Sequence, residues 1–256
     1  MNIQLGALDY LIVLPLVFLA GIVDSIAGGG GLITLPAYWS IGIPPAVALG
    51  TNKFASFSGT TFTTARFLKE GLLDVPVALI GAVFGLMGSW IGTQTALRVS
   101  ASFLNILLLV LIPIVAVVIL AMPKTGTVNR ALQIKLSKRL ALGSLASLVI
   151  GFYDGFFGPG TGTFLILIYT LMLKYDFVTA NANAKLVNLA SNFAALMGFI
   201  IAGKVLYAIA IPAAICGIAG NLLGSSMVLK KGNKLIKIIF ILVLILLMIK
   251  ILTDII

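Results

Sequence analysis

The chain has 256 residues, of which 61% are hydrophobic and only 9% charged, and its formal net charge is +10. A soluble globular domain carries about 25% charged residues, so this composition excludes a soluble enzyme or a soluble binding domain. The chain contains no histidine and a single cysteine, which excludes histidine-based catalysis, histidine metal ligands and an intrachain disulfide.

Continuous apolar segments predict an all-α polytopic membrane protein. Charge-free windows of about 19 residues match the length of helix that crosses about 30 Å of hydrocarbon. They are too continuous for the alternating strands of a β-barrel. We expect about 8–10 transmembrane or re-entrant helices, some of them broken. In chain order the segments are 8–26, 31–45, 47–66, 76–97, 103–121, 140–157, 162–174, 179–203, 205–229 and 235–253.

Two of these segments are weak candidates for a full crossing. Segment 31–45 contains Pro36 and ends at Pro44-Pro45, and segment 162–174 is too short for an untilted crossing. Each is either a spanning helix or a re-entrant, broken helix. Non-helical backbone at membrane depth is tolerated only where protein or a water-filled cavity covers it.

A polar motif in the first apolar segment occurs a second time. Residues 21–28 (GIVDSIAG) return as 151–158 (GFYDGFFG), which places Asp24 and Asp154 at equivalent positions inside apolar segments. Four further glycines in each half match at one fixed offset. Matched polar breaks in two hydrophobic halves indicate the binding site of a secondary transporter.

The basic residues predict that the two repeats have inverted topology. The repeats are residues 1–121 and 140–256, joined by the basic linker 122–139. Lysine and arginine stay on the cytoplasmic side, so the linker and the basic loop 230–237 should both be cytoplasmic. The equivalent loop of the first repeat, around 98–105, is one crossing away from the linker and should lie outside. Both termini should then lie outside as well.

A lysine follows each copy of the motif. Lys53 and Lys185 each lie a few residues into a segment that opens with polar residues. An ionisable side chain within a span costs about 2.5–3.5 kcal/mol on insertion scales, so duplicated charge indicates a function, with a purely structural pair as the alternative. In the inverted arrangement, depth in the membrane predicts the cross-repeat pairs Asp24–Lys185 and Asp154–Lys53.

Glycine runs follow both aspartates. No Gly-Lys-Ser/Thr follows them, so they are not phosphate-binding P-loops. They can break a helix and expose N–H groups that attract anions, or they can form a tight turn with close helix packing. The candidate helix-breaking glycines are Gly28, Gly29, Gly30, Gly31, Gly158, Gly160 and Gly162.

Amides and hydroxyls accompany the two lysines. Lys185, Asn188 and Asn192 have the spacing of one helix face, which is typical of a polar path or of interhelical hydrogen bonds. The candidate substrate-binding residues are Lys53, Lys185, Asn52, Ser56, Asn188 and Asn192, with Asp24 and Asp154 as coupling or lysine-orienting residues. Two Gly-x-x-x-Gly motifs, at 88–92 and 220–224, indicate close helix packing, either inside the chain or in a dimer.

Residues 21–36, together with Gly50-Thr51-Asn52-Lys53, resemble the sulfite exporter TauE/SafE family. The similarity continues through 151–159 and Ala184-Lys185-Leu186 and covers nearly the whole chain. The resemblance implies a bacterial inner-membrane protein that moves small sulfur-containing anions such as sulfite, sulfoacetate and sulfonates. It also implies a role in the transport path for Asp24, Asn52, Lys53, Asp154 and Lys185.

We therefore predict a secondary transporter, a permease or exporter, for a small anion, and not an enzyme. The two inverted halves would give alternating access. No ATP-binding motif is present, so coupling to a proton or sodium gradient or facilitated diffusion is expected. The expected partners are the anion and the lipid bilayer, without nucleic acid, cofactor or metal, and a homodimer is left open. The alternatives are a passive anion channel, a membrane-embedded enzyme or an assembly factor.

Overall fold

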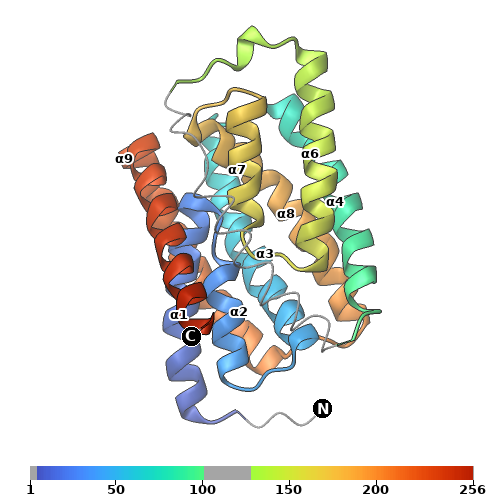
Figure 1. The fold of residues 1–256 in the computed structure, drawn as a ribbon, viewed down its shortest axis with the longest axis vertical. Helices are drawn as coiled ribbons and strands as arrows, with labels where there is room; N and C mark the ends of the chain where they lie inside the picture. Colours follow the sequence, from blue (N-terminus) through green and yellow to red (C-terminus); the bar gives the residue numbers. More distant parts are fainter. Residues whose placement is uncertain (1–4, 101–127, 256) are drawn as a thin grey trace.

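The computed structural model describes residues 5–100 and 128–255, with side chains described up to residue 235. This part of the chain forms eight α-helices, one short 3-10 helix and no strand, which confirms the all-α prediction (Figure 1). The helices are α1 (Ala7–Ala27), α2 (Gly31–Ser40), α3 (Pro45–Lys69), α4 (Val75–Ala96), the 3-10 helix η1 (Ala131–Gln133), α6 (Leu136–Phe156), α7 (Thr161–Met172), α8 (Phe177–Ile201) and α9 (Tyr207–Ile255).

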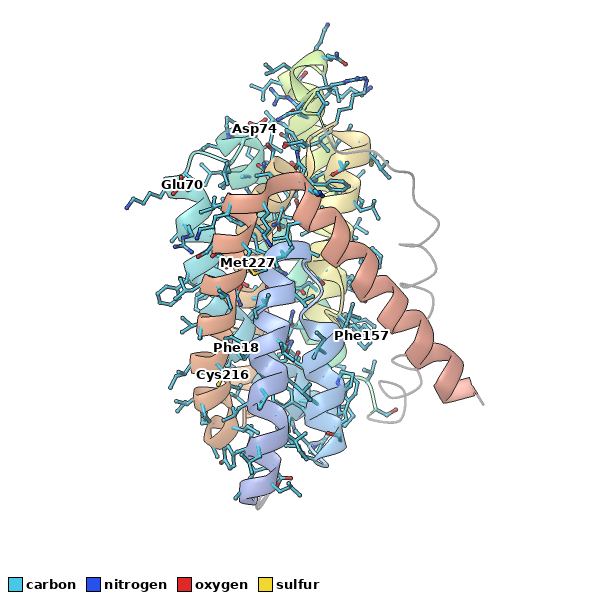
Figure 2. The ribbon with its side chains drawn as sticks, turned by 90° about the vertical axis from the view of Figure 1, so that its left-hand side faces the viewer. Phe18, Glu70, Asp74, Phe157, Cys216 and Met227 are labelled. Carbon is cyan, nitrogen blue, oxygen red and sulfur yellow. The ribbon has the colours of Figure 1, made fainter. Side chains whose placement is uncertain are left out.

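Several helices have the length of a membrane span. Among the described residues, α1, α4, α8 and the part of α9 up to Leu235 are long and apolar enough to cross a membrane. Gly232, with φ 55° and ψ −145°, interrupts α9, and the helix changes direction there (Figure 2). This bend separates the two predicted segments 205–229 and 235–253. The predicted segment 103–121 lies outside the described residues.

The surface of the bundle is apolar and its interior contains many polar side chains. Leu11, Leu145 and Ile215 are each more than half exposed, whereas Asn181 and Asn183 are fully buried. Exposing a large apolar surface to water is energetically unfavourable, whereas exposing it to lipid hydrocarbon is not. This distribution therefore fits a protein embedded in a membrane.

The helices α2 and α7 are half-length helices that begin in the middle of the bundle. They have 10 and 12 residues, so they rise only about 15 and 18 Å, compared with about 30 Å for the hydrocarbon core. Each follows a glycine turn: Gly28 has φ 77°, and Gly158 and Gly160 have φ 99° and 78°. Glycine adopts these left-handed conformations without steric cost. The glycine runs therefore break the helices, as predicted.

The two glycine turns touch each other. A Cβ atom on Gly28 would overlap the backbone of Gly162, and one on Gly162 would overlap Gly28. From this point α2 and α7 leave in opposite directions along the long axis of the bundle (Figure 1). The two broken helices thus place their N-terminal ends close together in the protein interior.

Helices of the first half of the chain pack against helices of the second half. α1 packs along α9, α4 packs along α6, and α3 packs against α8 between them. α3 and α8 run antiparallel, since Thr51 near the start of α3 contacts Leu206 beyond the end of α8, and Thr64 near the end of α3 contacts Lys185 near the start of α8. The inverted topology of the two repeats stays a prediction, and this antiparallel pairing agrees with it.

The Gly-x-x-x-Gly motifs lie at close contacts between helices of the same chain. A Cβ atom on Gly88 or Gly92 of α4 would overlap main-chain carbonyl oxygens of α6. A Cβ atom on Gly220 of α9 would overlap the carbonyl oxygen of Phe18 in α1. The packing role predicted for these motifs is confirmed, and both motifs pack within one chain.

Replacing Gly220 with alanine is expected to lower the free energy of unfolding by about 1–3 kcal/mol, because the added methyl group forces α1 and α9 apart. Gly217→Ala on the same helix is the matched control. Its added Cβ would lie 3.5 Å from the nearest heavy atom, an ordinary contact, and alanine is the better helix former. The measurement is the thermal unfolding of both variants in detergent. Equal losses of stability would contradict this account of α1–α9 packing.

Candidate functional site

Two buried ion pairs join the two halves of the chain. The Nζ atom of Lys53 lies 2.8 Å from Oδ1 of Asp154, and the Nζ atom of Lys185 lies 2.7 Å from Oδ2 of Asp24. In each pair the lysine comes from a central helix, α3 or α8. The aspartate comes from the last turn of the first helix of the other half, α6 or α1. These are the two cross-repeat pairs predicted from the sequence, and that prediction is confirmed.

The glycine turns leave the space that the ion pairs occupy. A Cβ atom on Gly30 would lie 2.8 Å from Cβ of Asp24. A Cβ atom on Gly158 would lie 3.1 Å from Nζ of Lys53 and 3.4 Å from Oδ1 of Asp154. The glycines at the helix breaks therefore have a second role. Because they have no side chain, a charged pair can lie directly against the backbone.

The Lys53–Asp154 pair is closed off from solvent. Its two side chains are 3% and 2% exposed. Lys53 also donates to Oδ1 of Asn192 at 3.0 Å, and Ser191 donates to Oδ2 of Asp154 at 2.6 Å. Asn192 in turn donates to Oδ1 of Asn188 at 3.1 Å. Both carboxylate oxygens of Asp154 are thus engaged by protein groups, as buried charge requires.

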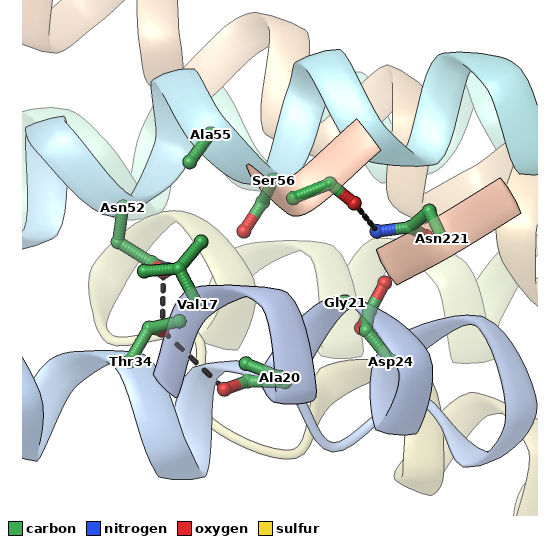
Figure 3. Close-up of a pocket in the computed structure, with 11 residues that line it drawn as sticks. Val17, Ala20, Gly21, Asp24, Thr34, Asn52, Ala55, Ser56 and Asn221 are labelled. Carbon is green, nitrogen blue, oxygen red and sulfur yellow. Dashed lines mark hydrogen bonds between the residues drawn. The ribbon is translucent and has the colours of Figure 1, made fainter. Parts of the chain in front are cut away.

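The Asp24–Lys185 pair differs, because its carboxylate reaches a pocket. The side chain of Lys185 is 1% exposed and that of Asp24 is 17% exposed. The carboxylate of Asp24 points into a narrow cavity of about 20 Å³ (Figure 3), which has room for about one water molecule. The cavity is lined by Val17, Ala20, Gly21, Asp24, Gly30, Thr34, Asn52, Ala55, Ser56, Gly217 and Asn221.

The polar atoms of this pocket come from four helices. Thr34 of α2 donates to Oδ1 of Asn52 on α3 at 2.5 Å. The hydroxyl of Ser56 points toward the same space (Figure 3). Asn221 of α9 donates to the carbonyl of Gly217 at 2.9 Å and completes the wall. The pocket thus combines one carboxylate with neutral hydrogen-bonding groups at the first turn of α2.

The predicted site residues fall into two groups. Asn52 and Ser56 line the pocket with Asp24, whereas Asn188 and Asn192 belong to the closed network around Lys53. Sequence reasoning missed Thr34 and Asn221 as parts of the pocket. The sequence does contain a signal for Asn221, because its equivalent in the first half, Ser89, is also polar. The hydroxyl of Ser89 donates to a main-chain carbonyl of α8 at 2.6 Å.

A second polar network lies at the end of the bundle near the turn between α3 and α4. Asp74 forms an ion pair with Arg139 of α6 and accepts a hydrogen bond from Tyr175 at 2.7 Å. Burial, together with the neighbouring carboxylate of Asp74, raises the pKa of Tyr175 well above its ordinary value, so its hydroxyl stays protonated and donates. This network ties three segments of the chain together at one end and was not predicted from the sequence.

The family model described as "Sulfite exporter TauE/SafE" matches residues 13–251. The chain belongs to the sulfite exporter TauE/SafE family. It is 36% identical over 219 residues to "Probable membrane transporter protein YfcA" of Escherichia coli strain K12, covering 86% of this chain and 80% of the relative. No solved structure gives a significant match.

Two further relatives support the assignment of this chain as a membrane transporter. A "Probable membrane transporter protein" of Haemophilus influenzae is 36% identical over 220 residues, covering 86% of this chain and 85% of the relative. "Probable membrane transporter protein ORF9" of Sinorhizobium sp is 34% identical over 237 residues, covering 93% and 90%. The chain is therefore a multi-pass membrane transporter and not an enzyme, and the family resemblance noted in the sequence is confirmed.

Proposed function

We propose that this TauE/SafE protein is a secondary carrier for a small sulfur-containing anion, such as a sulfur oxyanion or an organosulfonate. The observation that supports it best is the pair of crossed Lys–Asp contacts at two broken helices, one of which borders a polar pocket. The cell (inner) membrane location, the cytoplasmic linker 122–139 and the outside position of both termini belong to the same proposal.

The groups around the pocket suit an anion with several oxygen atoms. Lys185 offers a compact positive charge with three donors. The N-terminal turn of α2 adds the positive end of a helix dipole at Gly30, where anions are favoured. Thr34 in the same turn and Asn52 and Ser56 of α3 supply side-chain hydrogen-bonding groups. An anion bound here would replace the carboxylate of Asp24 as the partner of Lys185.

The small size of the pocket indicates that the helices around it must move before a substrate anion can bind. A sulfur oxyanion is several times larger than a water molecule, and the cavity of about 20 Å³ holds about one water molecule. In this proposal the structure is the closed state of the carrier, and substrate binds only when the helices around the pocket move. In the same cycle, the contacts of the Asp74–Arg139–Tyr175 network at the α3–α4 end of the bundle would also break. A two-state movement of inverted halves provides such a cycle.

Wild-type protein in proteoliposomes is expected to exchange a radiolabelled sulfur-containing anion against the same unlabelled anion with a saturable rate. Saturation follows because each cycle moves the anion through one site. The panel is sulfite, thiosulfate, sulfoacetate and isethionate, with acetate and protein-free liposomes as controls. Flux that rises linearly with concentration would favour the channel, and exchange of acetate alone would refute the sulfur-containing substrate class.

A further inference from the structure

We propose that Asp24 is the proton-accepting residue of the transport cycle, so that one proton moves with each monovalent anion. This inference rests on the proposed carrier function and specifies its coupling ion. Protonation of Asp24 from the pocket would release Lys185 from its ion pair. The freed ammonium group of Lys185 would then bind the substrate anion.

The exposure of the four paired side chains selects Asp24. It is 17% exposed, whereas Lys53, Asp154 and Lys185 are between 1% and 3% exposed. A proton can therefore reach Asp24 through the pocket without opening the closed network around Asp154. The pocket holds about one water molecule, which is enough to deliver a proton to a carboxylate oxygen.

Among the described residues that line the pocket or form an ion pair with Asp24, Lys185 is the charged partner of its carboxylate. Within the described residues, α2, α3 and α9 contribute only uncharged side chains to the pocket lining. Helix α7, which touches the end of α1, contributes the hydroxyl of Thr163 there. The ammonium of Lys185, from α8, is thus the charged group in contact with Asp24. Neutralising the carboxylate leaves a single unpaired positive charge next to the pocket.

The charges balance through the cycle. In the closed state the carboxylate of Asp24 and the ammonium of Lys185 sum to zero. After a proton adds to a carboxylate oxygen and a monovalent anion binds Lys185, the sum is again zero. An unpaired buried charge is strongly disfavoured, so the half-loaded states are costly and the two ions move together. Release of the anion on the other side returns Lys185 to Asp24, and the carboxylate loses its proton there.

The test uses wild-type protein in proteoliposomes with isethionate, a sulfonate whose single charge stays constant near neutral pH. A gradient of about one pH unit, alkaline inside, is expected to accumulate isethionate up to about tenfold, the limit for one proton per anion. A pH-sensitive dye in the lumen should report acidification when isethionate enters. Both results are measured on the wild-type protein and do not depend on how a variant folds.

The variant Asp24→Asn resembles the protonated acid and is expected to lose the response to the pH gradient. Accumulation should fall from tenfold to no accumulation, while exchange at equal pH continues at a changed rate. Asp9→Asn is the matched control, since Asp9 is a carboxylate in the first turn of the same helix, bonded to the backbone of Gly6. It should keep the full response.

The outcomes separate the two proposals. Isethionate flux in the wild type that ignores the pH gradient, or that follows a sodium gradient instead, would overturn proton coupling and leave the carrier standing. A gradient response that survives in Asp24→Asn would overturn the role of Asp24. No isethionate flux in the wild type would overturn both the sulfonate carrier and its coupling.

Discussion

Replacing Lys185 with methionine is expected to reduce anion exchange in proteoliposomes by about 30-fold or more. Loss of a buried, hydrogen-bonded charge costs about 2–5 kcal/mol of binding, which corresponds to that factor. Methionine keeps the length and apolar character of the side chain, so the packing of α8 is retained. The remaining carboxylate of Asp24 reaches the pocket, where water or a proton can stabilise it. The measurement is the initial rate of sulfite or isethionate exchange.

The matched control is Lys204→Met, which removes the same charge from the turn between α8 and α9. This residue is partly exposed and has no place in either ion pair. Size-exclusion chromatography and thermal unfolding should show that both variants are folded. Wild-type exchange in Lys185→Met would remove Lys185 from the proposed substrate site.

The ion pairs could be predicted from the sequence because buried charge has few solutions. Two aspartates and two lysines lie inside apolar segments, and each charge needs a partner that hydrocarbon cannot supply. The repeat then restricts which lysine meets which aspartate. The helix breaks could also be predicted from the sequence, because Gly28, Gly158 and Gly160 adopt backbone conformations that other residues rarely tolerate.

The unequal environment of the two pairs could not be predicted from the motif alone. Thr34 lines the pocket beside Asp24, and its equivalent in the second half of the chain is Phe164. Phe164 packs edge-on against Tyr153, with ring centroids 5.5 Å apart, directly after the break that follows Asp154. In the second half two aromatic rings thus pack together after the break, whereas in the first half Thr34 borders the pocket. Only the packed structure shows which copy of a repeated motif stays accessible.

The Asp74–Arg139–Tyr175 network shows a second limit of sequence reasoning. Its three residues lie in or next to loops, where charged and polar side chains are common and usually face water. Nothing in their spacing indicates that the α3–α4 turn meets the start of α6 and the α7–α8 loop. Their contact follows from the antiparallel packing of whole helices, which brings three distant segments to one end of the bundle.

Replacing Lys53 with methionine is expected to lower the free energy of unfolding by about 3–5 kcal/mol, the cost of leaving one member of a buried ion pair alone. Asp154 is 2% exposed, and it is not among the residues that line the pocket beside Asp24. Ser191 would remain as its donor, but a single hydroxyl does not balance the charge. Thermal unfolding in detergent measures the loss.

The double variant Lys53→Met/Asp154→Leu is expected to regain most of that stability, because buried ion pairs are often replaceable by well-packed apolar residues. Lys185→Met is the matched variant for comparison. Both variants remove a lysine from an equivalent position, yet Asp24 is 17% exposed and lines a pocket, whereas Asp154 is 2% exposed and is not part of that pocket's lining. Lys53→Met should therefore be clearly the less stable of the two. Equal stability would mean that the two pairs have the same access to water. Exposure would then no longer single out Asp24 as the proton-accepting residue.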